Sequence, residues 1–300
     1  MLQCGAIRAG VICAAVFFVG CTYLGEDEVG AATAAIEIGV VDLDTPTRNA
    51  VVRVAVGTTR CTGTLIGPDL VVTAAACGFN SVQHRAAANG QWTANPNGEV
   101  LVYFGPDRAN PIDVISASHI SLPPVPPTVA SVEPNMVLLR LHEQVTTDVA
   151  VPRAVLFSPP VLTSTTRIIQ VGFGGAQNRR YIGGQGYTTA GLGPNRFAYV
   201  VDVSQPGAGD SGTNVQAEDL GGPMFHGGIE GPLMGVLAQL APTSGTPTFG
   251  SGGAGHPSVV SWLQPKVTRH ADYGWVTTTG ISSQPPTVFY NPSGAPTVQI

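Results

Sequence analysis

The sequence predicts an all-β protein, and three observations carry this prediction. The 300 residues include 38 glycines and 25 prolines, which divide the chain into short segments. Many of these segments are rich in β-branched residues, whereas stretches typical of helices are rare. Charged residues make up 11% of the chain, against about 25% in average soluble domains, and hydrophobic residues make up 43%. A chain of this length and hydrophobicity can bury a large core.

The first 20 residues predict a signal peptide rather than a folded element. One cation, Arg8, precedes an apolar run over residues 9–20, which is too short to span a membrane. The run ends in FVGC at 18–21, which resembles a bacterial lipobox, the motif whose cysteine is acylated. Lipidation at Cys21 predicts an anchor in a membrane of the bacterial envelope. Cleavage without lipidation is the alternative, and it predicts a periplasmic or extracellular protein.

The five cysteines are consistent with export. Cys4 and Cys13 lie in the signal peptide, and Cys21 would carry the lipid. Cys61 and Cys77 then stay as a pair, for which a disulfide is expected in an oxidising compartment. A metal site would need two further ligands at suitable spacing, and the chain has neither CxxC nor HxxxH. No metal and no cofactor is therefore expected.

After an acidic spacer over 21–35, two series of short apolar runs predict strands. The first series consists of Val51–Val56, Thr64–Ile66, Leu70–Ala74, Glu99–Phe104, Val114–Leu122 and Met136–Leu141. The second consists of Arg153–Phe157, Arg167–Phe173, Phe197–Val203 and Leu233–Leu237. Turn signals rich in Gly, Pro and Asn separate the runs. The two series predict two barrels packed side by side.

One helix is expected, over Pro257–Lys266, where three apolar residues could share a face. From 277 to 300 the chain is rich in Thr, Ser and Pro, which predicts a partly ordered tail. The folded domain is therefore expected over 36–276. Its first barrel covers about 36–148 and its second about 149–276.

Four segments resemble landmarks of the trypsin- and chymotrypsin-like serine peptidases. CTGTLIGPDLVVTAAAC at 61–77 resembles the first-barrel signature of this family, in which a TAAHC segment ends in a disulfide-bonded cysteine. EPNMVLLRL at 133–141 resembles the D-I-A-L-L strand of the family, VGFG at 171–174 its GWG segment, and EDLGGPM at 218–224 its GDSGGP loop. The landmarks come in family order and cover about residues 36–275. The resemblance implies two packed antiparallel six-stranded β-barrels with a short C-terminal helix.

The resemblance also places the catalytic triad of the family, and all three positions are replaced. Ala76 stands where the family has histidine, Asn135 where it has aspartate, and Leu220 where it has the serine nucleophile. Leucine has no oxygen or sulfur to act as a nucleophile, and alanine cannot accept a proton. Glu218 and Leu220 occupy the positions whose backbone forms the oxyanion hole, and the charge of Glu218 is expected to oppose an oxyanion there. No catalytic residue is therefore expected.

A second segment, GDSG at 209–212, spells a nucleophile motif shortly before the GGP residues and makes Ser211 an alternative nucleophile. Thr213 and Asn214 follow it instead of Gly and Pro. None of the six histidines lies at the position that TAAHC would give. A solvated turn is therefore the favoured interpretation of this segment.

The replacements predict a non-enzymatic homologue, exported and lipid-anchored, that binds or scaffolds an unknown protein or peptide partner in the bacterial envelope. Two alternatives stay open: an active serine endopeptidase that uses Ser211, and a purely structural envelope protein. The net charge is −5 and Lys266 is the only lysine, so the sequence shows no basic patch. A nucleic-acid partner is therefore not expected.

Overall fold

The computed structural model divides the chain into two compact units, Met1–Ala34 and Ala35–Ile300. The residues that the structure describes all lie in the second unit: 40–79, 81, 84, 86, 88–95, 100–124, 135–157, 167–174, 178–187, 196–201, 217–239, 248–251, 257–268, 275–278 and 287–290. The predicted signal peptide, Cys21, the spacer and Ser211 lie outside these residues.

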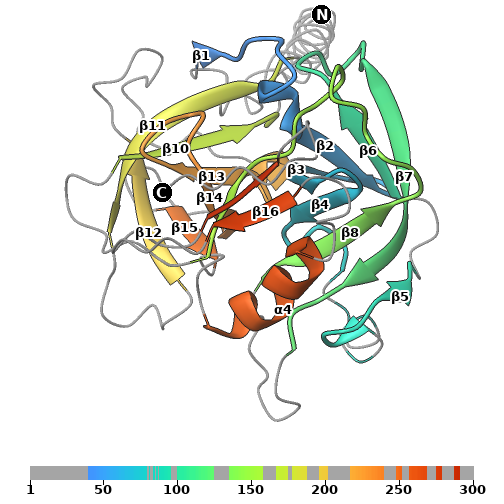
Figure 1. Ribbon diagram of the computed structural model, residues 1–300. Helices are drawn as coiled ribbons and strands as arrows, with labels where there is room; N and C mark the ends of the chain where they lie inside the picture. The colour runs from blue at the N-terminus through green and yellow to red at the C-terminus, as the bar shows by residue number, and fades with distance from the viewer. Residues whose placement is uncertain are drawn as a thin grey trace, which may run out of the picture. The chain divides into compact units, whose positions relative to one another are not determined.

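The first sheet closes on itself as a six-stranded antiparallel barrel (Figure 1). In order around the barrel, the strands are β2 (Val51–Val56), β3 (Thr59–Gly67), β4 (Leu70–Thr73), β8 (Val137–Leu141), β7 (Asp113–Ser121) and β6 (Val100–Phe104). Pairing of β6 with β2 completes the ring, and the two-residue β5 (Thr93–Ala94) extends it beside β7. The predicted first barrel is therefore confirmed.

These strands are apolar on both faces because each face meets a different core. Along β2, Val52 and Val54 pack inside the barrel, whereas Val51 packs on its outer side against the second sheet. In β4, Val71 lies inside and Val72 outside. Alternate residues of a strand point to opposite faces, so a strand buried on both sides reads as a continuous apolar run.

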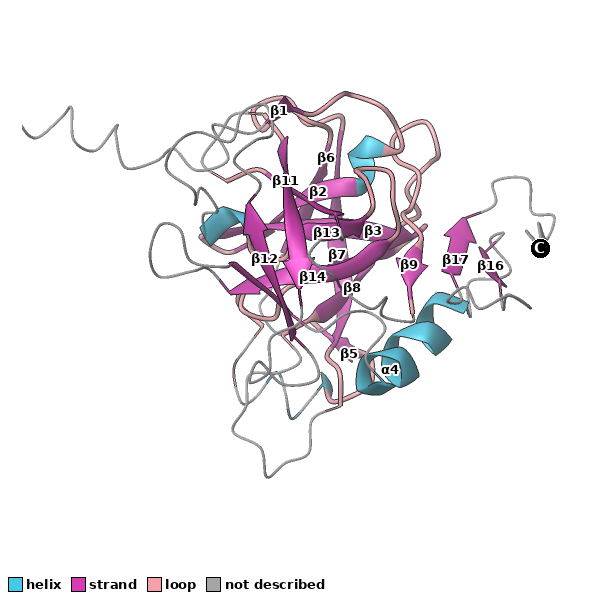
Figure 2. Cartoon of the chain, turned by 90° about the vertical axis from the view of Figure 1, so that its left-hand side faces the viewer, coloured by secondary structure: helices cyan, strands magenta, loops and turns pink. Residues whose placement is uncertain are grey.

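The second half of the chain builds another sheet, which forms a half-barrel (Figure 2). Its strands pair in the order β13 (Pro223–His226), β10 (Arg167–Gly172), β11 (Arg180–Tyr187), β12 (Arg196–Val201), β15 (Thr248–Ser251) and β14 (Leu233–Gln239). β13 also pairs with β14, and β1 (Val40–Val41) pairs with β11. Side chains are described for β10, β13 and most of β14 but not for β11, β12 and β15. A second complete barrel stays a prediction.

Beyond β14, the sheet continues through β9 (Val155–Leu156), β17 (Thr287–Tyr290) and β16 (Trp275–Thr278). β9 runs parallel to β14 and antiparallel to β17, and β16 and β17 form an antiparallel pair (Figure 2). Both strands of this pair fall in or at the edge of the segment predicted as a tail.

A second core lies between the outer side of the barrel and the second sheet, and one helix covers it. The predicted helix is confirmed as α4, and at Pro257–Thr268 it extends two residues further than expected. Val259, Leu263 and Val267 of α4 are buried in this core at helical spacing. No helix in the described part of the chain is long and apolar enough to cross a membrane.

Several strand predictions need correction. The run at Thr64–Ile66 belongs to the nine-residue β3, because the polar and glycine residues before it still pair with β2. The run at Arg153–Phe157 contains only two strand residues, those of β9. β11, β13 and β15 were not predicted, because glycines or a leading proline hide the alternation of apolar and polar residues in their sequences.

Candidate functional site

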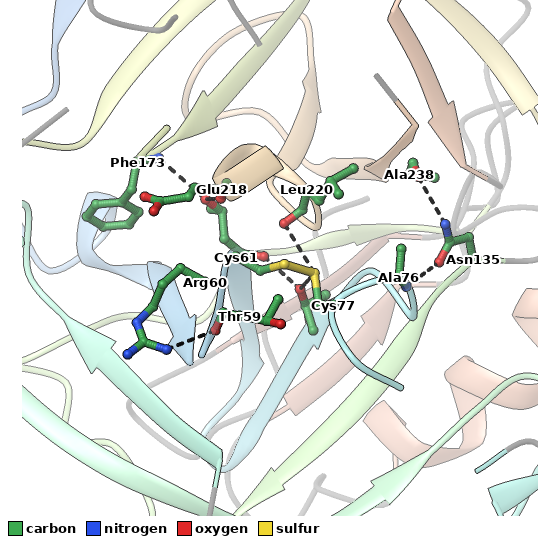
Figure 3. Close-up of a disulfide and its surroundings, with 12 residues drawn as sticks. Thr59, Arg60, Cys61, Ala76, Cys77, Asn135, Phe173, Glu218, Leu220 and Ala238 are labelled. Carbon is green, nitrogen blue, oxygen red and sulfur yellow. Dashed lines mark hydrogen bonds between the residues drawn. A yellow bond between two sulfur atoms is a disulfide. The ribbon is translucent and has the colours of Figure 1, made fainter. Parts of the chain in front are cut away.

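A disulfide joins β3 to the turn after β4. Cys61 is bonded to Cys77, their Cα atoms are 6.1 Å apart, and both residues are buried. The predicted pair is therefore confirmed (Figure 3). The hydroxyl of Thr73 in β4 also donates to the carbonyl of Thr62 in β3 at 2.7 Å. The turn that carries Ala76 is thus fixed to the barrel on both sides.

Ala76 and Asn135 are held together by hydrogen bonds. The N–H of Ala76 donates to Oδ1 of Asn135 at 2.8 Å, and the N–H of Ala75 donates to the Asn135 carbonyl at 3.4 Å. Nδ2 of Asn135 donates to the carbonyl of Ala238 in β14 at 3.0 Å (Figure 3). Asn135 is 6% exposed, whereas Ala76 is exposed. The amide of Asn135 therefore connects the barrel to the second sheet.

Leu220 lies in the turn after the short 3-10 helix η3 (Ala217–Asp219). Its carbonyl accepts the N–H of Thr62 at 2.9 Å, and the same oxygen lies 3.6 Å from Sγ of Cys77. Its side chain is partly buried and packs against the core of the first barrel. The structure therefore brings Leu220, Ala76 and Asn135 together around the disulfide (Figure 3).

Gly221 and Gly222 pack closely between the barrel and the second sheet. Gly221 has a φ of 81°, and a Cβ there would collide with the Thr73 hydroxyl and the Thr62 carbonyl. Its N–H donates to the carbonyl of Leu237 at 2.7 Å. A Cβ at Gly222 would lie 2.5 Å from a backbone oxygen of β10. Glycine is thus required at both positions by packing, independently of any chemistry.

Asp219 is completely buried beside the loop after β10. Its Oδ1 accepts the N–H of Gly174 at 2.7 Å. A Cβ on Gly172 or Gly174 would collide with its carboxylate. The two glycines of the VGFG segment therefore make room for this carboxylate, which holds the loop over 218–222 against β10.

The carboxylate of Glu218 is paired within the protein. Nη1 of Arg108 lies 2.9 Å from Oε2, and Nη2 donates to Oε1 at 3.2 Å. The carbonyl of Glu218 accepts the Thr62 hydroxyl at 2.9 Å. The negative charge that was expected to oppose an oxyanion is therefore balanced by a guanidinium. No local sequence pattern signals this pair, because its members are 110 residues apart.

A buried arginine, which sequence reasoning also missed, fastens the segment before β2. Arg179 is 0% exposed; it donates through Nε to Asp42 at 2.8 Å and through Nη1 to the carbonyl of Val51 at 3.0 Å. Burial lowers the pKa of Arg179, and the neighbouring charge of Asp42 partly offsets this. Burying a paired charge is costly, so this contact serves to fix position more than to add stability.

The three triad-equivalent positions carry no side chain that could act as a nucleophile or a general base. Ala76, Asn135 and Leu220 supply no hydroxyl, thiol, imidazole or carboxylate. Among the residues that the structure describes, no cluster of His, Cys, Asp and Glu could hold a metal ion. The alternative nucleophile Ser211 is not among them.

Comparison with known proteins adds no relative: no family model and no curated protein matches the chain. The resemblance to the trypsin-like peptidases therefore rests on the residues and on the geometry described above.

Proposed function

We propose that the chain is a catalytically inactive homologue of the trypsin-like serine peptidases that binds or scaffolds a partner in the bacterial envelope. One observation supports this most directly. Ala76, Asn135 and Leu220 gather around the Cys61–Cys77 disulfide, and these are the three positions at which the resemblance expects histidine, aspartate and serine.

The fold is compatible with this proposal. A closed six-stranded barrel precedes the second sheet, a half-barrel in which β13 pairs with both β10 and β14. The interface between the two sheets carries the candidate site. Two packed barrels with the site between them is the arrangement that the family would give.

The chemistry argues against peptidase activity. In serine peptidases, replacing the triad carboxylate by an amide alone costs about 10⁴ in turnover, because the histidine tautomer and its charge are no longer stabilised. Here the nucleophile and the general base are replaced as well. Triad residues act as a unit, so the losses do not add, but loss of the nucleophile removes most of the rate enhancement.

Binding is the function that the remaining surface favours. Ala76 is exposed and Leu220 is partly exposed, so apolar side chains stand at the surface where the family has histidine and serine. The disulfide and the Asn135 hydrogen bonds hold these residues on a rigid scaffold. Rigid positions at the meeting of two sheets are suited to recognition without conversion of the bound molecule.

A photo-crosslinking amino acid at position 76 tests the binding proposal in cells. We expect Ala76→p-benzoylphenylalanine to capture one dominant protein or peptide. The control is the same substitution at Ile112, which is 48% exposed and lies before β7. Identical adducts from both positions would contradict a specific cleft partner and would favour the purely structural alternative. Release of cleaved peptides that stops in Ser211→Ala would instead establish the active-peptidase alternative.

Anchoring through Cys21 is a separate part of the proposal, and the confirmed disulfide is compatible with export. We expect Cys21→Ser to release the protein from the membrane fraction. Cys13→Ser, within the predicted signal peptide, is the matched control and leaves fractionation unchanged. Equal membrane association of both variants at the same mass would overturn lipidation.

A further inference from the structure

Three arginines gather on the outer face of the first barrel, two from the β2–β3 hairpin and one from the loop after β6. The neighbours of Arg53 along β2 pack inside the barrel, so Arg53 points to the opposite face. On that face it is paired in register with Thr62 of β3 on one side and Tyr103 of β6 on the other. Arg60 lies two residues before Thr62, on the same face.

Arg108 lies near the same face because it pairs with Glu218, whose carbonyl accepts a hydrogen bond from Thr62. The Thr62 hydroxyl donates to the carbonyl of Glu218 at 2.9 Å, and the carboxylate of Glu218 pairs with Arg108 at 2.9 Å. Arg53, Arg60 and Arg108 therefore surround Thr62, and we call these three residues the arginine cluster. Arg60 and Glu218 lie on the same side of the disulfide in Figure 3. With Glu218 counted, the cluster carries an excess of two positive charges.

Arg53 forms no salt bridge with any residue that the structure describes. Its guanidinium carbon lies 4.3 Å from the centroid of the Tyr103 ring, and its Nε is buried without a hydrogen-bond partner. Burial lowers the pKa of Arg53, and so do the positive charges of Arg108 and Arg60, whereas Tyr103 and Glu218 partly offset these effects. A guanidinium stacked on a ring keeps its N–H groups in its own plane, where they can meet an acceptor from the side.

The other two arginines leave donors available as well. Nη1 of Arg60 donates to the carbonyls of Gly57 and Thr59 at 2.6 and 3.0 Å, which leaves its second terminal nitrogen for another acceptor. Arg108 is 33% exposed even though Glu218 occupies two of its nitrogens. The like charges of the cluster repel one another, and an anion bound among them would relieve this repulsion.

We propose that the arginine cluster binds a phosphate group. A doubly charged tetrahedral anion balances the excess of two charges and accepts hydrogen bonds from several guanidinium groups at different angles. A single carboxylate balances only one charge. The phosphate is either free or a terminal phosphomonoester of a lipid headgroup, since both carry about two negative charges and three or more terminal oxygens at mildly alkaline pH. In Figure 3, Arg60 and Glu218 lie on the opposite side of the disulfide from Asn135. Phosphate binding by the arginine cluster therefore does not depend on the proposed lack of peptidase activity.

Calorimetric titration of the full-length mature chain tests this site. The probes are inorganic phosphate, glycerol 3-phosphate as the soluble headgroup of a phosphomonoester lipid, and acetate, in chloride buffer at mildly alkaline pH. We expect Arg53→Gln and Arg60→Gln each to weaken phosphate binding about tenfold, as the loss of charge-assisted hydrogen bonds implies. Arg140→Gln is the matched control, since Arg140 is also on the first barrel and pairs with Asp69 at 3.3 Å. It changes the net charge equally and is expected to leave binding within about twofold, because only non-specific attraction is lost.

Binding of inorganic phosphate or of the headgroup more tightly than acetate supports the site. The probe that binds more tightly of the two shows whether the phosphate is free or part of a lipid headgroup. No binding of either probe, acetate binding as tight as phosphate, or equal weakening by Arg140→Gln would overturn it. Melting temperatures without phosphate check that the variants fold. Added phosphate is expected to raise the melting temperature of the natural chain and to raise that of Arg60→Gln by a smaller amount, because the variant binds about tenfold more weakly.

Discussion

Two sets of side chains at the candidate site differ in how closely the structure constrains them: Asp219 and Gly221 of the loop over 218–222, and the triad-equivalent Ala76 and Leu220. In the loop, Asp219 is buried against two glycines, and Gly221 has backbone atoms of the barrel where a Cβ would stand. Ala76, by contrast, is exposed, and the side chain of Leu220 is only partly buried. The loop is thus constrained because it joins two sheets. These packing demands do not depend on catalytic groups, so under the proposed loss of peptidase activity the motif would be retained for packing alone.

The largest effect is expected from Gly221→Ala. The added methyl group forces a left-handed residue into strain and overlaps the Thr62 carbonyl, so the free energy of unfolding should fall by about 3–6 kcal/mol. Gly227→Ala is the matched control, because Gly227 has a φ of 79° and no atom near its virtual Cβ. It should cost only about 1 kcal/mol for the backbone conformation. If urea denaturation gives equal losses of unfolding free energy for both variants, the close packing around Gly221 does not contribute to stability.

Removal of the disulfide is expected to have the next largest effect. Cys61→Ala with Cys77→Ala opens a link across 16 residues, which should lower the free energy of unfolding by about 3 kcal/mol because the unfolded chain gains freedom. Urea denaturation with and without reductant measures this. Reductant should shift the midpoint of the natural chain and not that of the double variant; an identical shift in both would contradict the assignment.

A smaller loss is expected from Asn135→Ala. The change leaves the N–H of Ala76 and the carbonyl of Ala238 without their side-chain partner, at a cost of about 1–3 kcal/mol. Asn110→Ala removes an exposed amide that donates to Asp107, and it should change stability by no more than about 0.5 kcal/mol. Thermal or urea unfolding compares the two variants. Similar values would mean that Asn135 does not join the sheets.

The smallest effect is expected from Leu220→Ser. The side chain is only partly buried, so truncation should cost about 1 kcal/mol, and we expect no peptidase activity because Ala76 stands at the position of the general base. Urea denaturation and a peptide-cleavage assay measure the two quantities. Cleavage by this variant alone would show that a base lies within reach of position 220.

Sequence patterns were sufficient for those features that arise from local composition. The valine-rich runs predicted most strands of the first barrel, and the disulfide was predicted because Cys61 and Cys77 are the two cysteines that remain after the predicted signal peptide and Cys21. The resemblance predicted that Ala76, Asn135 and Leu220 would meet. In each case the signal lay within a short stretch or in a motif with a fixed order.

Other features depend on contacts between distant residues, which no local pattern records. The Arg108–Glu218 pair joins residues from separate parts of the chain. The arginine cluster adds Arg53 and Arg60 of the β2–β3 hairpin, so a chain with few charged residues has three arginines in one place. Glycine-rich β11 pairs through its backbone, and its sequence lacks the alternation that reveals a strand. The glycines of VGFG matched a motif, but only the buried Asp219 explains why they are needed.

Labelling of the purified natural chain with a fluorophosphonate probe, read by intact mass and site mapping, tests the central claim most directly. The probe reacts with any activated serine, whatever the substrate. An active serine peptidase, labelled in parallel, is the control. We expect no adduct on this chain, because none of the triad-equivalent positions carries a nucleophile or a base. Stoichiometric labelling of Ser211, or of any other serine, would contradict the proposed loss of catalysis.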